Sequence, residues 1–212
     1  IKVLPPWCVS LLIAVCGALL GVMPLVGAGI LGAAACGIMG ILIPYARVLA
    51  AKKPQEYSAW SFLIGLGWIA LGILFLGITA LFVSTPSEIR ALTMMWLPII
   101  GAGGFAQLFV GALSYLMPVV IGGGPSVVRI GIAILDWQFA LRVALRNGAL
   151  FLQVVLFCAA ASTAVTTLRY ALWLVVIMTF AIDIVMFARA GKNQARARRE
   201  RIKEMSESRQ VQ

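Results

Sequence analysis

The stretch Trp60–Val83, with the sequence WSFLIGLGWIALGILFLGITALFV, decides the fold of this chain. It contains no charged residue, and as a helix rising 1.5 Å per residue it is longer than the roughly 30 Å of hydrocarbon in a bilayer. Apolar residues occur on every side of such a helix, whereas the strands of a membrane barrel alternate apolar and polar residues. The stretch therefore predicts a membrane-spanning helix.

Five more apolar runs surround this one, and together they fill most of the 212 residues. Hydrophobic residues make up 62% of the chain and charged residues 11%, which is more apolar surface than a soluble domain of this length can bury. We predict an all-α polytopic bundle over residues 1–189 and a basic tail over 190–212. The predicted spans are Trp7–Met23, Gly29–Ala50, Trp60–Val83, Leu97–Ile121, Ala149–Val165 and Tyr170–Ala188.

The positions of Lys and Arg predict the orientation of the bundle, because cytoplasmic loops are enriched in these residues. If both termini are cytoplasmic, the outer turns hold only Arg90 and Arg169. The inner segments then hold all the other basic residues before Arg189, namely Lys2, Arg47, Lys52, Lys53, Arg129, Arg142 and Arg146. We expect a multi-pass protein of the plasma membrane with cytoplasmic N- and C-termini.

The basic tail is expected to lie against the inner leaflet. Its arginines Arg196, Arg198, Arg199 and Arg201 would attract anionic lipid headgroups, by about 1 kcal/mol for each charge near the surface. Nucleic acid is not the expected partner, since no aromatic residues that could stack on bases are interleaved with the charges.

Small residues recur at helical spacing and predict close helix packing. Gly17 and Gly21 are four residues apart in the first run, and Gly32 begins a small-residue ridge that continues through Cys36 and Gly40 in the second. In the third run Gly65 and Gly72 are one heptad apart. We interpret these residues as packing faces within one bundle.

The fourth run carries a small and polar stripe on an otherwise apolar helix. Its residues follow helical spacing and are Gly104, Gln107, Gly111, Ser114 and Pro118. A stripe of this kind should face protein or a cavity, because a buried amide such as that of Gln107 needs partners. Two interpretations stay open, an interhelical hydrogen bond or one wall of a pocket for a cofactor or quinone. The same choice applies to Gln153 in the fifth run.

After this run, Gly122-Gly-Gly-Pro125 should end the helix at the inner surface. The following residues 126–146 predict one amphipathic helix on the inner leaflet, with Trp137 as its interfacial anchor. Its apolar face would be formed by Val127, Ile130, Ile134, Trp137, Leu141 and Leu145. Asp136 would form a surface ion pair with Arg129 or Arg142.

Asp183 is the one acidic residue well inside a predicted span, which makes it a candidate functional residue. It could carry protons or pair with an arginine of a partner. It also lies six residues before Arg189, about 9 Å along a helix, so it could simply reach the inner interface.

The chain contains no histidine. Haem held by two histidines, zinc sites with histidine ligands and histidine proton relays therefore cannot be built from this chain alone. Cys8, Cys16, Cys36 and Cys158 all lie in apolar runs without a CxxC spacing and are interpreted as packing residues. We expect no catalytic residue and no metal ligand in this chain by itself.

Three segments resemble a known family. They are PQEYSAWS at 54–61, GFAQLFVGALSYLMPVVIGGGP at 104–125, and Leu135-Asp136 followed by ALRVALRNG at 140–148. They are similar to the membrane domain of actinobacterial copper oxidases, in which this domain precedes a cupredoxin region like that of copper nitrite reductases. That domain is in turn similar to a haem- and copper-containing membrane family connected with the response to nitric oxide.

The resemblance covers about residues 54–165 and implies a bacterial plasma membrane and a role near electron transfer. The histidine-bearing helices of that family lie ahead of the matching region, so this chain resembles only the second half of the membrane domain. The resemblance implies that haem or copper would be bound through a partner or a missing N-terminal segment.

Three functions follow as hypotheses. The chain is a membrane module or subunit that supports a copper- or haem-dependent oxidoreductase, a small transporter or channel, or a structural or assembly subunit of a membrane complex. The expected partners are the bilayer, anionic lipids and other membrane subunits.

Overall fold

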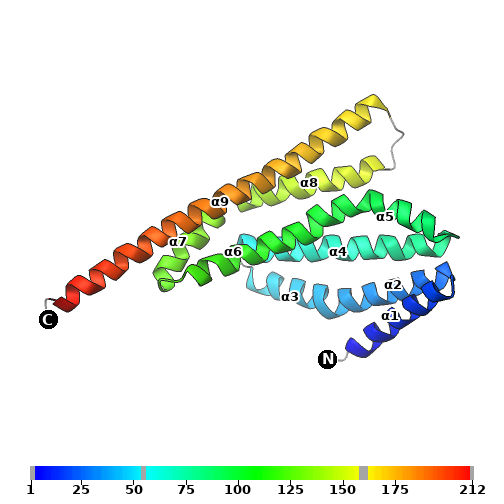
Figure 1. Ribbon diagram of the computed structural model, residues 1–212, viewed down its shortest axis with the longest axis horizontal. Helices are drawn as coiled ribbons and strands as arrows, with labels where there is room; N and C mark the ends of the chain where they lie inside the picture. The colour runs from blue at the N-terminus through cyan, green and yellow to red at the C-terminus, as the bar shows by residue number, and fades with distance from the viewer. Residues whose placement is uncertain (1–2, 54–55, 158–161, 211–212) are drawn as a thin grey trace. The chain divides into compact units, whose positions relative to one another are not determined.

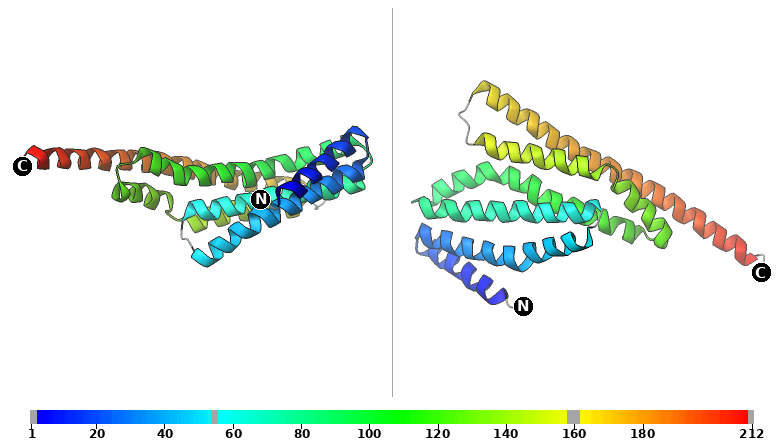
Figure 2. Two further views of the ribbon diagram at one scale, coloured as in Figure 1. Left: turned by 90° about the horizontal axis from the view of Figure 1, so that it is seen from below. Right: turned by 180° about the vertical axis from the view of Figure 1, so that it is seen from behind.

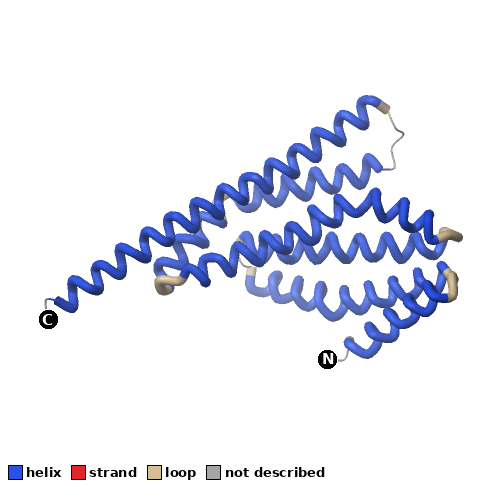
Figure 3. The backbone as a smooth tube through the Cα atoms, in the orientation of Figure 1, coloured by secondary structure: helices blue, strands red, loops and turns tan. Residues whose placement is uncertain are grey.

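The computed structural model describes residues 3–53, 56–157 and 162–210, and every regular element in these ranges is a helix. The predicted all-α class is confirmed. Residues 54 and 55 of the family-like segment, Cys158 and part of the predicted Ala149–Val165 span lie outside the described ranges. Short turns join the helices in the described parts of the chain (Figure 3).

In the part of the chain that the structure describes, five helices are long and apolar enough to cross a membrane, which indicates a membrane protein. They are Met23–Lys52, Tyr57–Phe82, Pro86–Ile121, Phe139–Phe157 and Thr163–Ser208. The first predicted span becomes the shorter helix α1, Leu4–Leu19.

The chain divides into two compact units. The first comprises Ile1–Pro54 and Leu63–Leu108, and the second comprises Gln55–Phe62 and Phe109–Gln212. The long helix α4, Tyr57–Phe82, contributes its first residues to the second unit and the rest to the first.

In the first unit, α1 and α2, Met23–Gly37, form an antiparallel pair (Figure 1). Gly21 makes the turn between them at a φ of 69°, which glycine adopts without strain. A side chain on Gly17 would collide with the backbone of Val26, and one on Gly29 would collide with the backbone of Ala14. The predicted glycine packing therefore lies between helices of one unit, whereas Gly21 serves the turn.

Two π-helical turns interrupt the long apolar helices of the first unit. One is η1, Ile38–Leu42, between α2 and α3, Ile43–Lys52. The other is η2, Gly101–Ala106, which follows α5, Pro86–Ile100, and leads into α6, Gln107–Ile121. A proline lies close to each turn, Pro44 after η1 and Pro98 before η2. Proline removes an α-helical hydrogen bond, and a π turn absorbs the resulting change in register.

Helix α5 begins well before the predicted span at Leu97. Thr85 caps it by accepting a hydrogen bond from the Glu88 N–H at 3.4 Å, and the Glu88 carboxylate accepts one from the Ser84 N–H at 3.2 Å. These two hydrogen bonds cap the helix and extend it into polar sequence, including Arg90, that an apolar run does not reveal.

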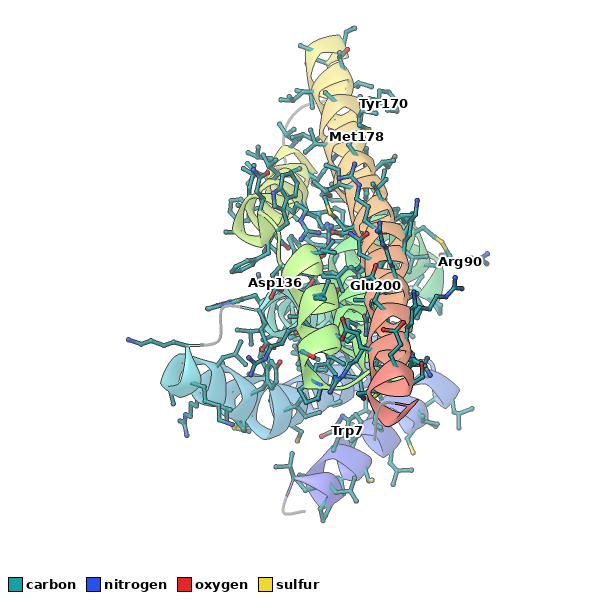
Figure 4. The ribbon with its side chains drawn as sticks, turned by 90° about the vertical axis from the view of Figure 1, so that its left-hand side faces the viewer. Trp7, Arg90, Asp136, Tyr170, Met178 and Glu200 are labelled. Carbon is teal, nitrogen blue, oxygen red and sulfur yellow. The ribbon has the colours of Figure 1, made fainter. Side chains whose placement is uncertain are left out.

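The second unit is built around α9, Thr163–Gln210, which has 48 residues. Helices α7, Pro125–Leu135, and α8, Phe139–Phe157, both lie alongside it (Figures 1 and 2). Tyr170 lies toward the N-terminal end of α9 and Glu200 toward its C-terminal end (Figure 4). The predicted tail is therefore helical through Gln210.

The prediction of a single amphipathic helix over 126–146 is wrong. Helix α7 ends at Leu135, and α8 begins only at Phe139. Between them Gln138 has a φ of 47°, a left-handed conformation that does not continue a helix. In α8 the polar residues Arg142 and Arg146 face the interior, while Leu141 and Leu145 are exposed. The physical reason is that the arginines pair with a buried acid, so the apolar side of α8 is left to face the surroundings.

A single methyl group tests the close packing of α1 on α2. Gly29→Ala should lower the thermal unfolding midpoint of the purified protein in detergent, because the new Cβ collides with the backbone of Ala14. Gly37→Ala is the matched control, since nothing lies within 4 Å of a Cβ at that position. The control should be neutral or slightly stabilising, by up to about 1 kcal/mol. Equal effects of the two changes would contradict this packing.

Candidate functional site

Buried charged residues gather at one place in the second unit, which we name the Asp183 cluster. It consists of Tyr57, Arg142, Arg146, Thr179 and Asp183. The exposed fraction is 4% for Arg142, 0% for Arg146 and 1% for Asp183. Charged side chains are almost never buried this completely unless they are paired.

Helical spacing brings the cluster together. Arg142 and Arg146 are one turn apart on α8, and Thr179 and Asp183 are one turn apart on α9. The two helices pack on each other, so the two pairs face one another. Tyr57, the first residue of α4, completes the set from a position 126 residues before Asp183.

The Asp183 carboxylate has three donors. Arg142 Nη1 donates to Oδ1, and Arg146 Nη2 donates to Oδ2. The Tyr57 hydroxyl also donates to Oδ2, at 2.9 Å. Two guanidinium groups thus share one carboxylate, and charge-assisted bonds of this kind are about twice as strong as neutral ones.

Other N–H groups of the two arginines donate hydrogen bonds to residues of further helices. Arg142 Nη2 donates to the Leu135 carbonyl at the end of α7, and its guanidinium lies 4.5 Å from the centre of the Tyr57 ring. Arg146 donates from Nε to Thr179 Oγ1 and from Nη1 to the Tyr57 hydroxyl, both at 3.1 Å. Its guanidinium lies 3.9 Å from the centre of the Phe180 ring. Cation–π contact with two aromatic faces adds to the stabilisation of the excess positive charge.

Asp136 lies at the edge of the cluster, at the C-terminal cap of α7. Its carboxylate accepts a hydrogen bond from the Tyr57 N–H at 2.7 Å and so caps the start of α4. Burial raises the pKa of this carboxyl above its ordinary value and Glu56 adds to the rise, while the Tyr57 N–H and Arg142 oppose it. The sequence predicted a surface ion pair between Asp136 and Arg142, but Arg142 forms its ion pair with Asp183.

The predicted stripe runs through η2 and α6, and its glycines lie in helix contacts. A side chain on Gly104 would collide with Ile69 in the first unit, and one on Gly111 would meet the Ser58 carbonyl at 3.2 Å in the second. Gln107 is fully buried, and Ser114 donates to the Val110 carbonyl at 2.7 Å. The glycines therefore allow close contact with α4, and the alternative of a cofactor or quinone pocket wall stays a prediction.

Gln153 joins α8 to α9 by an interhelical hydrogen bond. Its Nε2 donates to the Arg169 carbonyl at 2.7 Å, and its Oε1 accepts from Arg169 Nε at 3.4 Å. Arg169, which the sequence predicted to lie in an outer turn, is therefore part of α9 and bonded to α8.

Of the four tail arginines singled out from the sequence, Arg198 and Arg201 form hydrogen bonds with the turn after α6. Arg196 pairs with Glu200 at 3.0 Å along the exposed face of α9. Arg198 donates to the Ile121 carbonyl at 2.9 Å, and Arg201 donates to the Gly123 carbonyl at 2.7 Å. Arg199 is exposed.

Sequence reasoning identified Asp183 but missed its partners Tyr57, Arg142 and Arg146. The available signal was a polar stripe on residues 142, 146 and 153 of a helix whose other sides are apolar. In a membrane protein, such a stripe points to the interior of the bundle. Within the described residues, no group of three or more His, Cys, Asp or Glu side chains could hold a metal ion.

Comparisons with protein-family models, with curated proteins and with solved structures each give no match. The similarity to copper oxidase membrane domains stays a prediction that rests on its sequence motifs.

Removing the charge of Asp183 tests the cluster. Asp183→Asn leaves two buried guanidinium groups without a counter-charge, and breaking a buried pair in this way costs about 3–5 kcal/mol. We expect a large fall in unfolding free energy, measured by titrating the folded protein in mild detergent with a denaturing detergent. Asp136→Asn is the control, since this side chain is only partly buried and the amide oxygen can still accept from Tyr57. A stability loss no larger for Asp183→Asn than for Asp136→Asn would contradict the assignment.

The raised pKa of Asp136 predicts a pH dependence of stability. The folded state holds a proton on this carboxyl to higher pH than the unfolded state does. Stability should therefore fall as the pH rises from the ordinary carboxyl range through the raised value. Asp136→Asn should flatten this part of the profile of thermal midpoint against pH. The exposed Glu204→Gln should leave it unchanged, and an unchanged slope in Asp136→Asn would argue against the shift.

Proposed function

We propose that this chain is a membrane-embedded module or subunit that anchors and supports a copper- or haem-dependent oxidoreductase. The redox context is taken from the resemblance of residues 54–165 to copper oxidase membrane domains. The absence of histidine from the sequence supports a division of labour in which another polypeptide, or another part of a longer one, supplies the metal ligands.

One observation favours this role over transport. Asp183 is engaged by two guanidinium groups and a tyrosine hydroxyl. Moving a proton or cation onto this carboxylate would leave two buried positive charges without a partner, which is costly in a low-dielectric interior. The cluster is thus suited to holding helices in place and poorly suited to shuttling ions.

The helices that meet at the cluster support the same proposal. Tyr57 belongs to α4, Leu135 to α7, the two arginines to α8, and Asp183 to α9. A buried network of charge-assisted hydrogen bonds that joins four helices favours one arrangement of them. We further propose that this end of the second unit faces the cytoplasm, because Lys52 and Lys53 lie at the C-terminal end of α3, shortly before α4 begins, and the basic part of α9 follows Asp183.

The proposal predicts that metal is acquired only with a partner. The tagged full chain should be purified from membranes alone and after co-expression with a histidine-bearing membrane protein encoded beside it. We expect copper or haem, measured by elemental analysis and haem absorbance, in the complex and not in the chain alone. Asp183→Asn should lower the amount of complex while turnover per complex stays the same, and Asp136→Asn should change neither.

Two results would overturn the proposal. One is stoichiometric metal on the chain purified without any partner. The other is an ion flux in proteoliposomes that contain only this chain, lost in a folded Asp183→Asn variant and kept in Asp136→Asn, which would favour a transporter.

A further inference from the structure

A cavity of about 390 Å³ lies in the second unit between the turn after α6 and the charged half of α9. Its lining residues are Gly123, Gly124, Arg198, Arg201, Ile202 and Met205. It is separate from the Asp183 cluster and shares no residue with it.

The two arginines of this cavity have no acidic partner among the described residues. The ion pairs on the same stretch of α9 are Arg196 with Glu200 and Lys203 with Glu207, and neither involves a cavity arginine. Arg198 uses Nη1 to bond the Ile121 carbonyl, and Arg201 uses Nη1 to bond the Gly123 carbonyl and Ser126 Oγ at 3.2 Å. These bonds fix both guanidinium groups in position and leave their other N–H groups for an external acceptor.

The turn opposite the arginines adds to the positive potential. Gly122, Gly123 and Gly124 all have positive φ, at 68°, 101° and 90°, and they bring the backbone close to Arg201. Helix α7 begins directly after them at Pro125, so the positive end of its dipole and its unbonded first-turn N–H groups are directed at this turn. Fixed guanidinium groups combined with a helix N-terminus favour a phosphate-type anion.

Apolar walls complete the cavity. Ile202 and Met205 line it and are about half exposed, and Val120 at the end of α6 is 81% exposed. A free phosphate ion would not bury this apolar surface, whereas the glycerol and first methylene groups of a phospholipid would. The arrangement also lies at the end of an apolar helix that is long enough to span the bilayer.

We propose that this cavity binds the phosphate of an anionic phospholipid headgroup. Arg198 and Arg201 bind the phosphate oxygens, the α7 N-terminus faces the same group, and Ile202 and Met205 contact the apolar part of the lipid. Of the four arginines that the sequence predicts to attract lipid headgroups, Arg198 and Arg201 therefore form the site. Arg196 and Arg199 contribute only general attraction to the membrane surface.

Native mass spectrometry of the full chain in detergent tests this site. Phosphatidylglycerol is titrated into the wild-type protein, into Arg198→Gln/Arg201→Gln and into Lys192→Gln/Arg199→Gln. The last variant removes the same charge from exposed positions of the same helix. We expect the cavity variant to bind phosphatidylglycerol roughly tenfold more weakly or worse, and the control to bind within about twofold of wild type. Phosphatidylcholine and inorganic phosphate should neither bind as tightly nor displace phosphatidylglycerol.

Each other outcome overturns the proposal. Equal weakening in both double variants shows diffuse attraction without a site, and displacement by equimolar inorganic phosphate shows a free-anion site instead of a lipid site. If the cavity variant loses its helical circular dichroism, Ile202→Glu decides the question by placing a carboxylate in the cavity wall while both arginines are kept. It should abolish phosphatidylglycerol retention, whereas Ser206→Glu, outside the lining, should keep it. Retention by Ile202→Glu overturns the site.

Discussion

The pairing of one buried carboxylate with two guanidinium groups is the constraint on which the second unit depends. A buried Asp183 without a counter-charge would be strongly destabilising, and so would a buried Arg142 or Arg146 without one. Because they neutralise one another, α8 must present its arginines to α9 and its leucines outward. The orientation of both helices, and the position of Tyr57 at the start of α4, follow from this single requirement.

The structure also shows how a membrane protein separates polar and apolar surface. The most deeply buried side chains of the second unit include Arg146, Asp183 and Gln194, whereas Leu174 and Ile184 are exposed. Gln194 follows the same logic, since its Nε2 donates to the Pro118 and Gly122 carbonyls near the end of α6. Polar groups inside the unit satisfy backbone and charge, and the apolar exterior needs no protein partner in lipid.

The helices themselves could be predicted from the sequence, because a long uncharged apolar run can satisfy its backbone in a bilayer only as a helix. The limits of the helices could not, since caps such as Thr85 and Glu88 carry α5 into polar sequence. Asp183 was identifiable as a candidate because a lone intramembrane acid is rare. Its partners were not, because Tyr57 lies 126 residues away and Arg142 resembles one charge of a surface helix when only local periodicity is considered. The turn at Gln138, which separates α7 from α8, contains no glycine or proline by which it could be predicted from the sequence.

The split of opposite charges between α8 and α9 has a consequence for biogenesis. An arginine at the centre of a span costs about 2.5–3.5 kcal/mol when a single helix is inserted from the translocon and less toward the ends, and α8 carries two arginines near one end. Asp183 on the next helix cancels part of that cost only if both helices leave the channel together. The two helices should accordingly enter the bilayer as a helical hairpin, with synthesis of α9 reaching Asp183 before α8 is released into lipid.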